Sequence, residues 1–130
     1  MLDLDHFKGF NDQWGHQSGD TCLRAVAEVM RHCAIRHGGI AARYGGEEFM
    51  MLLRVDDKAQ AQAIAEELRV AIERIEIDHE ASGSTASCTA SIGIAVHDRQ
   101  DGATLSTMLT QADRALYRAK EEGRNRVRIH

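Results

Sequence analysis

Hydrophobic residues recur along this chain with two different spacings, which predict where helices and strands lie. Apolar positions three and four residues apart indicate an amphipathic helix, and apolar positions that alternate with polar ones indicate a strand. On this basis helices are expected from residue 18 or 20 to 37, from 58 to 77 and from 104 to 122. Strands are expected at 1–5, 40–44, 48–55, 88–96 and 127–129, with loops at 9–19 and 81–85.

The order of these elements, βαββαβαβ, indicates the fold class. Gly45-Gly46 separates two apolar runs and predicts a tight hairpin in the middle of the chain. Alternating helices and strands with one such hairpin fit an α/β (α+β) sandwich of the ferredoxin-like βαββαβ kind. A chain of 130 residues can bury one core, so a single domain spanning 1–130 is expected. Because the first strand has no turn or cap before it, we expect this domain to be truncated at its N-terminus.

Composition and charge exclude several classes of protein. Sixteen Lys and Arg against 20 Asp and Glu give a net charge of −4, which argues against binding of a nucleic-acid polymer but not of a single nucleotide. The apolar run Phe49–Leu53 is far shorter than the ~20 residues that span a bilayer, and no signal peptide opens the chain. Three cysteines without CxxC spacing are typical of reduced, buried residues, so a cytoplasmic domain is expected.

Acidic residues lie at the end of the first predicted strand and in the hairpin turn. Asp3 and Asp5 alternate with leucines, and Glu47 and Glu48 follow the glycine pair. In a βαββ unit the first strand lies beside the hairpin, so Asp3 or Asp5 is expected near Glu47. Two such carboxylates repel by ~4 kcal/mol at the effective dielectric of a protein surface, and a bound Mg²⁺ or Mn²⁺ removes that cost. Solvated strand ends are the alternative interpretation, but glycines that let a phosphate approach the backbone favour a metal site.

Two further groups of polar residues are candidates for nucleotide binding. Lys120 and Arg124 lie four residues apart at the end of the last helix, where they can hold phosphates or simply complement the helix dipole. A second group lies in and around the predicted loop 9–19, and its members can contact a purine edge or serve as ordinary loop and cap residues. This group consists of Lys8, Asn11, Asp12, His16 and Asp20.

These motifs together resemble one known family. Gly45-Gly46-Glu47-Glu48-Phe49 resembles the GGDEF/GGEEF signature of bacterial diguanylate cyclases. The opening motif of that family resembles Asp3–Lys8, Asn11-Asp12, Gly15-His16 and Gly19-Asp20. Its closing motifs resemble Ser91-Ile92-Gly93, Ala112-Asp113, Ala115-Leu116-Tyr117, Ala119-Lys120 and Gly123-Arg124-Asn125. The resemblance therefore covers the whole chain.

The resemblance implies both a fold and an activity. The fold would be the palm-type one of nucleotide cyclases, with a central, mostly antiparallel sheet flanked by helices. The activity would be that of a nucleotidyltransferase that condenses two GTP into cyclic di-GMP and two pyrophosphates, for bacterial second-messenger signalling such as biofilm regulation. Each domain would offer a half-site, so catalysis would require a second copy of the domain in a homodimer. An upstream sensory or dimerising domain, and with it a membrane anchor, would lie outside this chain.

The resemblance also assigns roles in catalysis. Asp3, Glu47 and the backbone carbonyl of Leu4 would hold the divalent metal, Mg²⁺ or Mn²⁺. Glu47 would also take the proton of the attacking 3′-hydroxyl, and Glu48 would support the same metal cluster. Lys8 would stabilise the transition state.

The remaining roles concern the substrate. Asn11 and Asp20 would hydrogen-bond the guanine edge of GTP, with His16 close to the nucleotide. The phosphates would be accommodated by Gly45, Gly46, Lys120 and Arg124.

One position departs from the family pattern. Many members carry an Arg-x-x-Asp inhibitory motif that binds the product, but here Arg36 is followed by Gly39 where the aspartate would be. Glycine has no side chain to accept the product's N–H groups, so this inhibitory site is degenerate and retains only Arg36 of its two motif residues. A catalytically silent module that binds GTP or cyclic di-GMP is the alternative function, although the complete set of catalytic residues favours an active enzyme.

Overall fold

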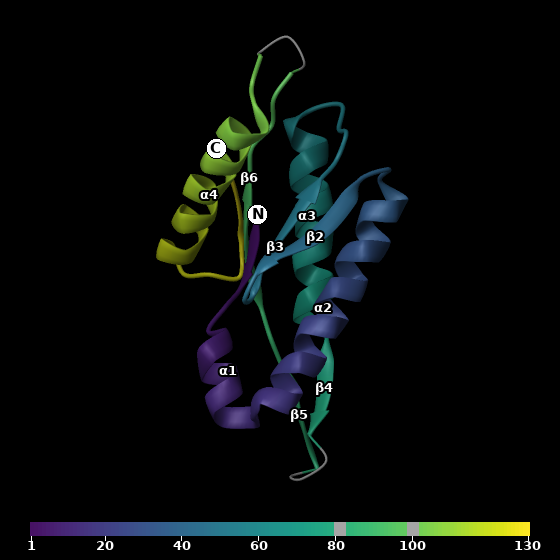
Figure 1. Cartoon of the computed structure of the whole chain (residues 1–130), viewed down its shortest axis with the longest axis vertical. Coiled ribbons are helices and arrows are strands. Elements are labelled where there is room, and N and C mark those ends of the chain that lie inside the picture. The colour runs from purple at the N-terminus through teal and green to yellow at the C-terminus, as the bar shows by residue number, and fades with distance from the viewer. Residues whose placement is uncertain (80–82, 99–101) are drawn as a thin grey trace.

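A five-stranded sheet forms the centre of this computed structural model, which describes residues 1–79, 83–98 and 102–130 (Figure 1). The helices are α1 (Phe7–Trp14), α2 (His16–Arg36), α3 (Lys58–Glu73) and α4 (Leu105–Glu121). The strands are β1 (Leu2–Leu4), β2 (Ile40–Gly45), β3 (Glu48–Leu52), β4 (Glu76–His79), β5 (Ser84–Ser87), β6 (Ala90–Ile94) and β7 (Val127–Ile129). None of these helices combines the length and the apolar character needed to cross a membrane.

The short strand β1 lies at the middle of the central sheet. The strand order is β2-β3-β1-β6-β7, and all neighbours are antiparallel except β6 and β7, which are parallel. In β1, Leu2 pairs with Phe49 of β3 and Ile92 of β6, whereas Asp3 pairs with Glu48 and Ser91. Since side chains alternate between the faces of a strand, the leucines of β1 enter the core and Asp3 lies on the opposite face. The predicted palm-type, mostly antiparallel sheet is therefore confirmed.

Helices cover both faces of this sheet. The face that carries Leu2, Leu4 and Phe49 packs on α2 and α3, and those three side chains are at most 2% exposed. Helix α4 packs on the other face, chiefly against β6, as Figure 1 shows. The cysteines are free and buried, which agrees with the reduced state expected of them.

The segment expected to be a loop at 9–19 is helical instead. Helix α1 covers Phe7–Trp14, and α2 begins at His16 rather than at residue 18 or 20. Gly15, with φ of +82°, separates the two helices and adopts a backbone conformation that other residues rarely adopt. The expectation was wrong because Phe7 and Phe10, three residues apart, stack with their ring centroids 6.0 Å apart and bury one side of α1.

The helix expected from 58 to 77 also ends early. Helix α3 stops at Glu73, and β4 then pairs with β5 to form a separate two-stranded sheet. Ile77 pairs with Ala86 in this sheet and both are buried, so the apolar residue that extended the helical pattern belongs to a strand. The predicted loop 81–85 was wrong at its end, because β5 starts at Ser84; residues 80–82 lie outside the described part of the chain.

Other boundaries agree more closely with the sequence pattern. The hairpin of β2 and β3 turns at Gly45-Gly46, although β3 ends at Leu52 and β6 spans only Ala90–Ile94. Thr104 caps α4 by accepting a hydrogen bond from the backbone N–H of Thr107 at 3.1 Å. Gly123 follows the end of α4 with φ of +113°, as expected of a glycine that ends a helix.

Close packing of α4 on β6 predicts that Gly93 cannot be enlarged. A Cβ at this position would lie 2.1 Å from the Ala112 carbonyl oxygen and 2.2 Å from the Leu116 backbone nitrogen. We expect Gly93→Ala to lower the free energy of unfolding by about 1–3 kcal/mol, since the helix backbone must move to relieve the overlap. Urea unfolding followed by circular dichroism measures this change.

A matched control is Gly9→Ala on the exposed surface of α1, where an added Cβ meets nothing within 4 Å. That variant is expected to gain about 0.5–1 kcal/mol from the better helix propensity of alanine. Equal stability of the Gly93→Ala variant and the wild type would contradict the close packing of α4.

Candidate functional site

Asp3 is the buried carboxylate at the centre of the candidate site. Its Oδ2 lies 2.8 Å from the Nζ of Lys120 on α4, and its side chain is 12% exposed. Burial raises the pKa of Asp3 above its usual value, the Lys120 ammonium opposes this shift, and the neighbouring charges of Glu47 and Asp5 add to it. The contribution of the Glu47 charge to the pKa of Asp3 agrees with the expected proximity of these two residues.

The β2–β3 turn brings the two glutamates beside β1. Gly46 has φ of +53°, which favours glycine, and its carbonyl oxygen accepts a hydrogen bond from the Arg43 Nε at 2.8 Å. The carbonyl oxygen of Glu47 accepts a hydrogen bond from the Leu4 backbone N–H at 3.3 Å, and Glu48 pairs with Asp3 across the strands. Both glutamate side chains are half-buried. The turn thus places carboxylates next to Asp3 without enclosing them.

These oxygen donors fit a hard divalent cation that other ligands complete. Within residues 1–79, 83–98 and 102–130, no three His, Cys, Asp or Glu side chains are gathered closely enough to form a metal cage. Asp3 and Glu47 offer two carboxylates, and Mg²⁺ typically takes one or two from a protein and fills its shell with water and phosphate oxygens. A positive charge, the Lys120 ammonium, already lies beside the Asp3 carboxylate. The charge and the donor types therefore suit Mg²⁺ or Mn²⁺.

Asp5 has a different environment from Asp3. Its Oδ1 accepts a hydrogen bond from the Ser91 hydroxyl at 2.7 Å, and its Oδ2 accepts from the Thr89 hydroxyl at 2.7 Å and from the Asn125 backbone N–H at 3.0 Å. The sequence pattern left Asp3 and Asp5 open as partners of Glu47, and the hydrogen bonds to Asp5 make Asp3 the better candidate. The role of Asn125 was missed, and its only sequence signal was its place after Gly123-Arg124.

Helices α1 and α2 carry Lys8, predicted to stabilise the transition state, and the residues predicted to contact the guanine edge or to lie close to the nucleotide. Lys8, His16 and Asp20 are exposed, whereas Asn11 is half-buried. Among the described residues the buried Asn11 Oδ1 has no hydrogen-bond partner, and a Cβ on Gly19 would lie 1.8 Å from it. The absence of a side chain at residue 19 therefore lets the Asn11 side chain lie against Gly19 in the first turn of α2, and Asp20 follows Gly19 in the sequence.

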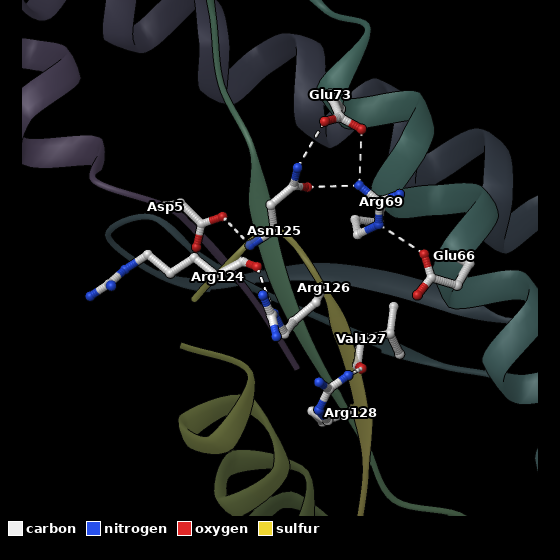
Figure 2. A network of polar contacts seen from close by, with 9 residues as sticks. All are labelled: Asp5, Glu66, Arg69, Glu73, Arg124, Asn125, Arg126, Val127 and Arg128. Carbon is white, nitrogen blue, oxygen red and sulfur yellow. Dashed lines mark hydrogen bonds and ion pairs between the residues drawn. The ribbon is translucent and has the colours of Figure 1, made fainter. Parts of the chain in front are cut away.

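The two predicted phosphate ligands lie in different surroundings. Lys120 is paired with Asp3, as described above. Arg124 is exposed, lies after the end of α4 with φ of +60°, and points its guanidinium away from the other labelled residues in Figure 2. Among the described residues the structure shows no hydrogen bond or ion pair of that guanidinium.

Arg36 lies at the end of α2 and forms an ion pair with Glu67 of α3. Gly39 is packed so tightly that a Cβ would lie 2.2 Å from Leu53 Cδ2 and 2.4 Å from the Leu52 carbonyl oxygen. No larger side chain fits at residue 39 without movement of β3. The glycine that replaces the aspartate of the inhibitory motif therefore agrees with the packing at this position.

The family model described as "Diguanylate cyclase, GGDEF domain" matches residues 1–126. The chain belongs to this family. The GGDEF domain is 39% identical over 129 residues to diguanylate cyclase A of Treponema denticola, an alignment that covers 99% of this chain and 34% of that protein. It is 41% identical over 128 residues to diguanylate cyclase VdcA of Vibrio cholerae, covering 98% of this chain and 37% of that protein. The chain thus spans about a third of the length of these curated relatives.

A solved structure supports the same family and fold. The GGDEF domain of DgcB from Caulobacter crescentus, in complex with c-di-GMP, superposes with a TM-score of 0.89 at 40% sequence identity. The superposition covers 98% of this chain and 74% of that chain. At this similarity the arrangement of β1, the signature turn and α4 is that of a GGDEF domain.

The raised pKa of Asp3 predicts how pH affects stability. A carboxyl group whose pKa is higher in the folded than in the unfolded chain favours the folded state when it is protonated. Its contribution is complete below the usual value of 3.8 and is lost as the pH rises through the raised pKa. Without metal, the Asp3→Asn variant is therefore expected to be at least as stable as the wild type at pH 7. As the pH falls, the free energy of unfolding of the wild type should rise relative to that of the variant. Urea unfolding of both proteins from about pH 7 to pH 4 measures the difference.

Added Mn²⁺ provides the control for this experiment. It should stabilise the wild type at pH 7 and leave Asp3→Asn nearly unchanged, because the variant lacks one of the two carboxylate ligands. A variant that is clearly less stable than the wild type in metal-free buffer at pH 7 would contradict this description of Asp3.

Proposed function

We propose that this domain is a diguanylate cyclase that condenses two GTP into cyclic di-GMP and two pyrophosphates. The observation that carries the proposal is the pairing of Asp3 with Lys120 beside the signature turn, in a chain that belongs to the GGDEF family. A buried carboxylate next to a second carboxylate suits a divalent cation, and a lysine beside them suits the phosphates of the nucleotide. The c-di-GMP bound to the related domain of DgcB supports the identity of the product.

The catalytic residues would act around the α-phosphate. Mg²⁺ or Mn²⁺ held by Asp3, Glu47 and the Leu4 carbonyl would supply charge neutralisation at that phosphate. Glu47 takes the proton of the 3′-hydroxyl, and Glu48 maintains the negative potential that attracts the cation. Lys8, which is exposed on α1, stabilises the charge that develops in the transition state.

The substrate residues would select guanine and hold the phosphates. Guanine presents N1–H and N2–H donors, which the Asp20 carboxylate accepts together with the Asn11 amide, while His16 lies close to the nucleotide. Adenine presents an acceptor at N1, so Asp20 discriminates against ATP. The phosphates are accommodated by the backbone of Gly45 and Gly46 and by the cations of Lys120 and Arg124.

A second copy of the domain would complete the reaction. Cyclic di-GMP has two phosphodiester bonds, each formed between the 3′-hydroxyl of one nucleotide and the α-phosphate of the other. One set of residues binds one GTP, so two domains facing each other bring two GTP together. A homodimer is therefore the active species in this proposal.

Replacement of Glu47 tests the proposed chemistry. Glu47→Gln keeps the size of the side chain but removes a metal ligand and the proposed base, so we expect turnover to fall by about 100-fold or more. The measurement incubates the purified chain with GTP and Mg²⁺ and resolves the products by chromatography with mass detection. The matched control is Glu28→Gln on the exposed surface of α2, which removes only an ion pair with Arg31 and should keep wild-type activity.

Two outcomes would contradict the proposal in different ways. A Glu47→Gln variant that retains more than about a tenth of the wild-type rate would remove Glu47 from its proposed roles. Binding of GTP by the wild type without formation of cyclic di-GMP, in a chain held as a dimer by a fused coiled coil, would instead support the alternative, a silent binding module.

The altered inhibitory motif predicts that the enzyme resists its product. Arg36 is engaged by Glu67, and Gly39 offers no carboxylate, so added cyclic di-GMP should not lower the initial rate through this site. The measurement is the initial rate in the presence of increasing cyclic di-GMP. Arg36→Ala is the control and should respond to added product as the wild type does. Inhibition that the Arg36→Ala variant abolishes would show that the site still works.

A further inference from the structure

Asp5 is a buried carboxylate whose oxygens are both engaged by donors of the protein. It is 8% exposed and accepts hydrogen bonds from Ser91, Thr89 and the backbone of Asn125. These donors are uncharged and lie on two segments that are distant in the sequence, the start of β6 and the turn after α4. A carboxylate held in this way joins those segments to β1 and has little capacity left for a metal ion.

The turn after α4 has a strained backbone that needs such contacts. Arg124 and Asn125 have φ of +60° and +43°, and a residue other than glycine pays about 1–2 kcal/mol for this left-handed conformation. The backbone N–H of Arg124 donates to the Ala119 carbonyl oxygen at 3.0 Å, and the Arg126 Nε donates to the Arg124 carbonyl oxygen at 2.9 Å. The contact of Asp5 with the Asn125 N–H completes the hydrogen bonds of this turn (Figure 2).

The side chain of Asn125 ties the same turn to α3. Its Nδ2 donates to Glu73 at 2.8 Å, and its Oδ1 accepts from the Arg69 Nη1 at 2.8 Å. Arg69 is itself held by Glu66 and Glu73, as Figure 2 shows. The backbone around Arg124 is therefore fixed from β1 on one side and from α3 on the other, whereas the guanidinium of Arg124 extends away from the network.

We propose that Asp5 is a positioning residue, which acts through Asn125 to hold Arg124 where it contacts the terminal phosphates of the nucleotide. This inference rests on the proposed function, because it assumes the phosphate role of Arg124. The β1 segment then serves the nucleotide twice, with Asp3 in the strand facing the cation and Asp5, just after its end, orienting the phosphate-binding turn.

A double-mutant cycle on the whole chain tests this inference. The variants are Asp5→Ala, Arg124→Ala and the combination of both, and the probe is 3′-deoxy-GTP with Mg²⁺, which lacks the attacking hydroxyl. Each single variant is expected to bind the probe about tenfold more weakly, the loss of one charge-assisted contact. The double variant should bind no more weakly than Arg124→Ala, since Asp5 acts through Arg124. Affinity for GMP, which has no terminal phosphates, should not change.

A conservative replacement separates positioning from metal binding. In Asp5→Asn the amide oxygen still accepts from the Asn125 N–H, and the amide nitrogen donates to the Ser91 hydroxyl oxygen. This variant should therefore bind the probe with an affinity close to that of the wild type. Should Asp5→Ala fail to fold, Asp5→Ser replaces it in the cycle, because the shorter polar side chain also lacks the Oδ2 that accepts from the Asn125 N–H.

Any result other than the expected one would contradict either the positioning role of Asp5 or the proposed function. Additive losses in the double variant, an equal loss of GMP affinity, or unchanged affinity in a folded Asp5→Ala would overturn the positioning role. If the wild type makes cyclic di-GMP and the variants give one of these results, the positioning role fails and the proposed function stands. A wild type that gives the expected cycle without making cyclic di-GMP overturns only the cyclase activity, and failure to bind 3′-deoxy-GTP overturns both.

Discussion

The burial of two aspartates, Asp3 in the central strand β1 and Asp5 just after its end, constrains the rest of the structure. A buried carboxylate is costly unless hydrogen bonds or an opposite charge compensate it. Asp5 is compensated by the hydroxyls of Thr89 and Ser91 and by a backbone N–H, whereas Asp3 is compensated by the Lys120 ammonium. The partners of Asp5 are part of the folded chain, and the partner of Asp3 is a flexible side chain that can give way to a metal ion.

This difference connects the fold with the chemistry that we propose for it. The hydrogen bonds of Asp5 fasten β1 to β6 and to the turn after α4, so the elements around the site share one rigid support. Asp3 lies on the same strand but in a position where its negative charge is only partly satisfied, as its raised pKa indicates. Residues that are unfavourable for stability in the metal-free protein are typical of functional sites.

The parts of the structure that sequence predicts well are those with strong local signals. Gly45-Gly46 marked the hairpin, and the spacing of apolar residues placed the last helix at 104–122, within one residue of α4 at each end, because both signals depend on nearby residues. Helix α1 and the β4–β5 hairpin were missed because their apolar residues are few and acquire their meaning from packing. The hydrogen bond between Asp5 and Asn125 joins residues 120 positions apart, a contact that no local pattern reveals.

The dependence of activity on protein concentration shows directly whether one domain supplies only half of the site, as we propose. The measurement is the initial rate of cyclic di-GMP formation per chain at saturating GTP and Mg²⁺, over a range of protein concentrations that spans dimer formation. We expect a rate per chain that rises with protein concentration until the dimer is saturated. Formation of cyclic di-GMP at a constant rate per chain by a protein that sediments as a monomer would contradict it.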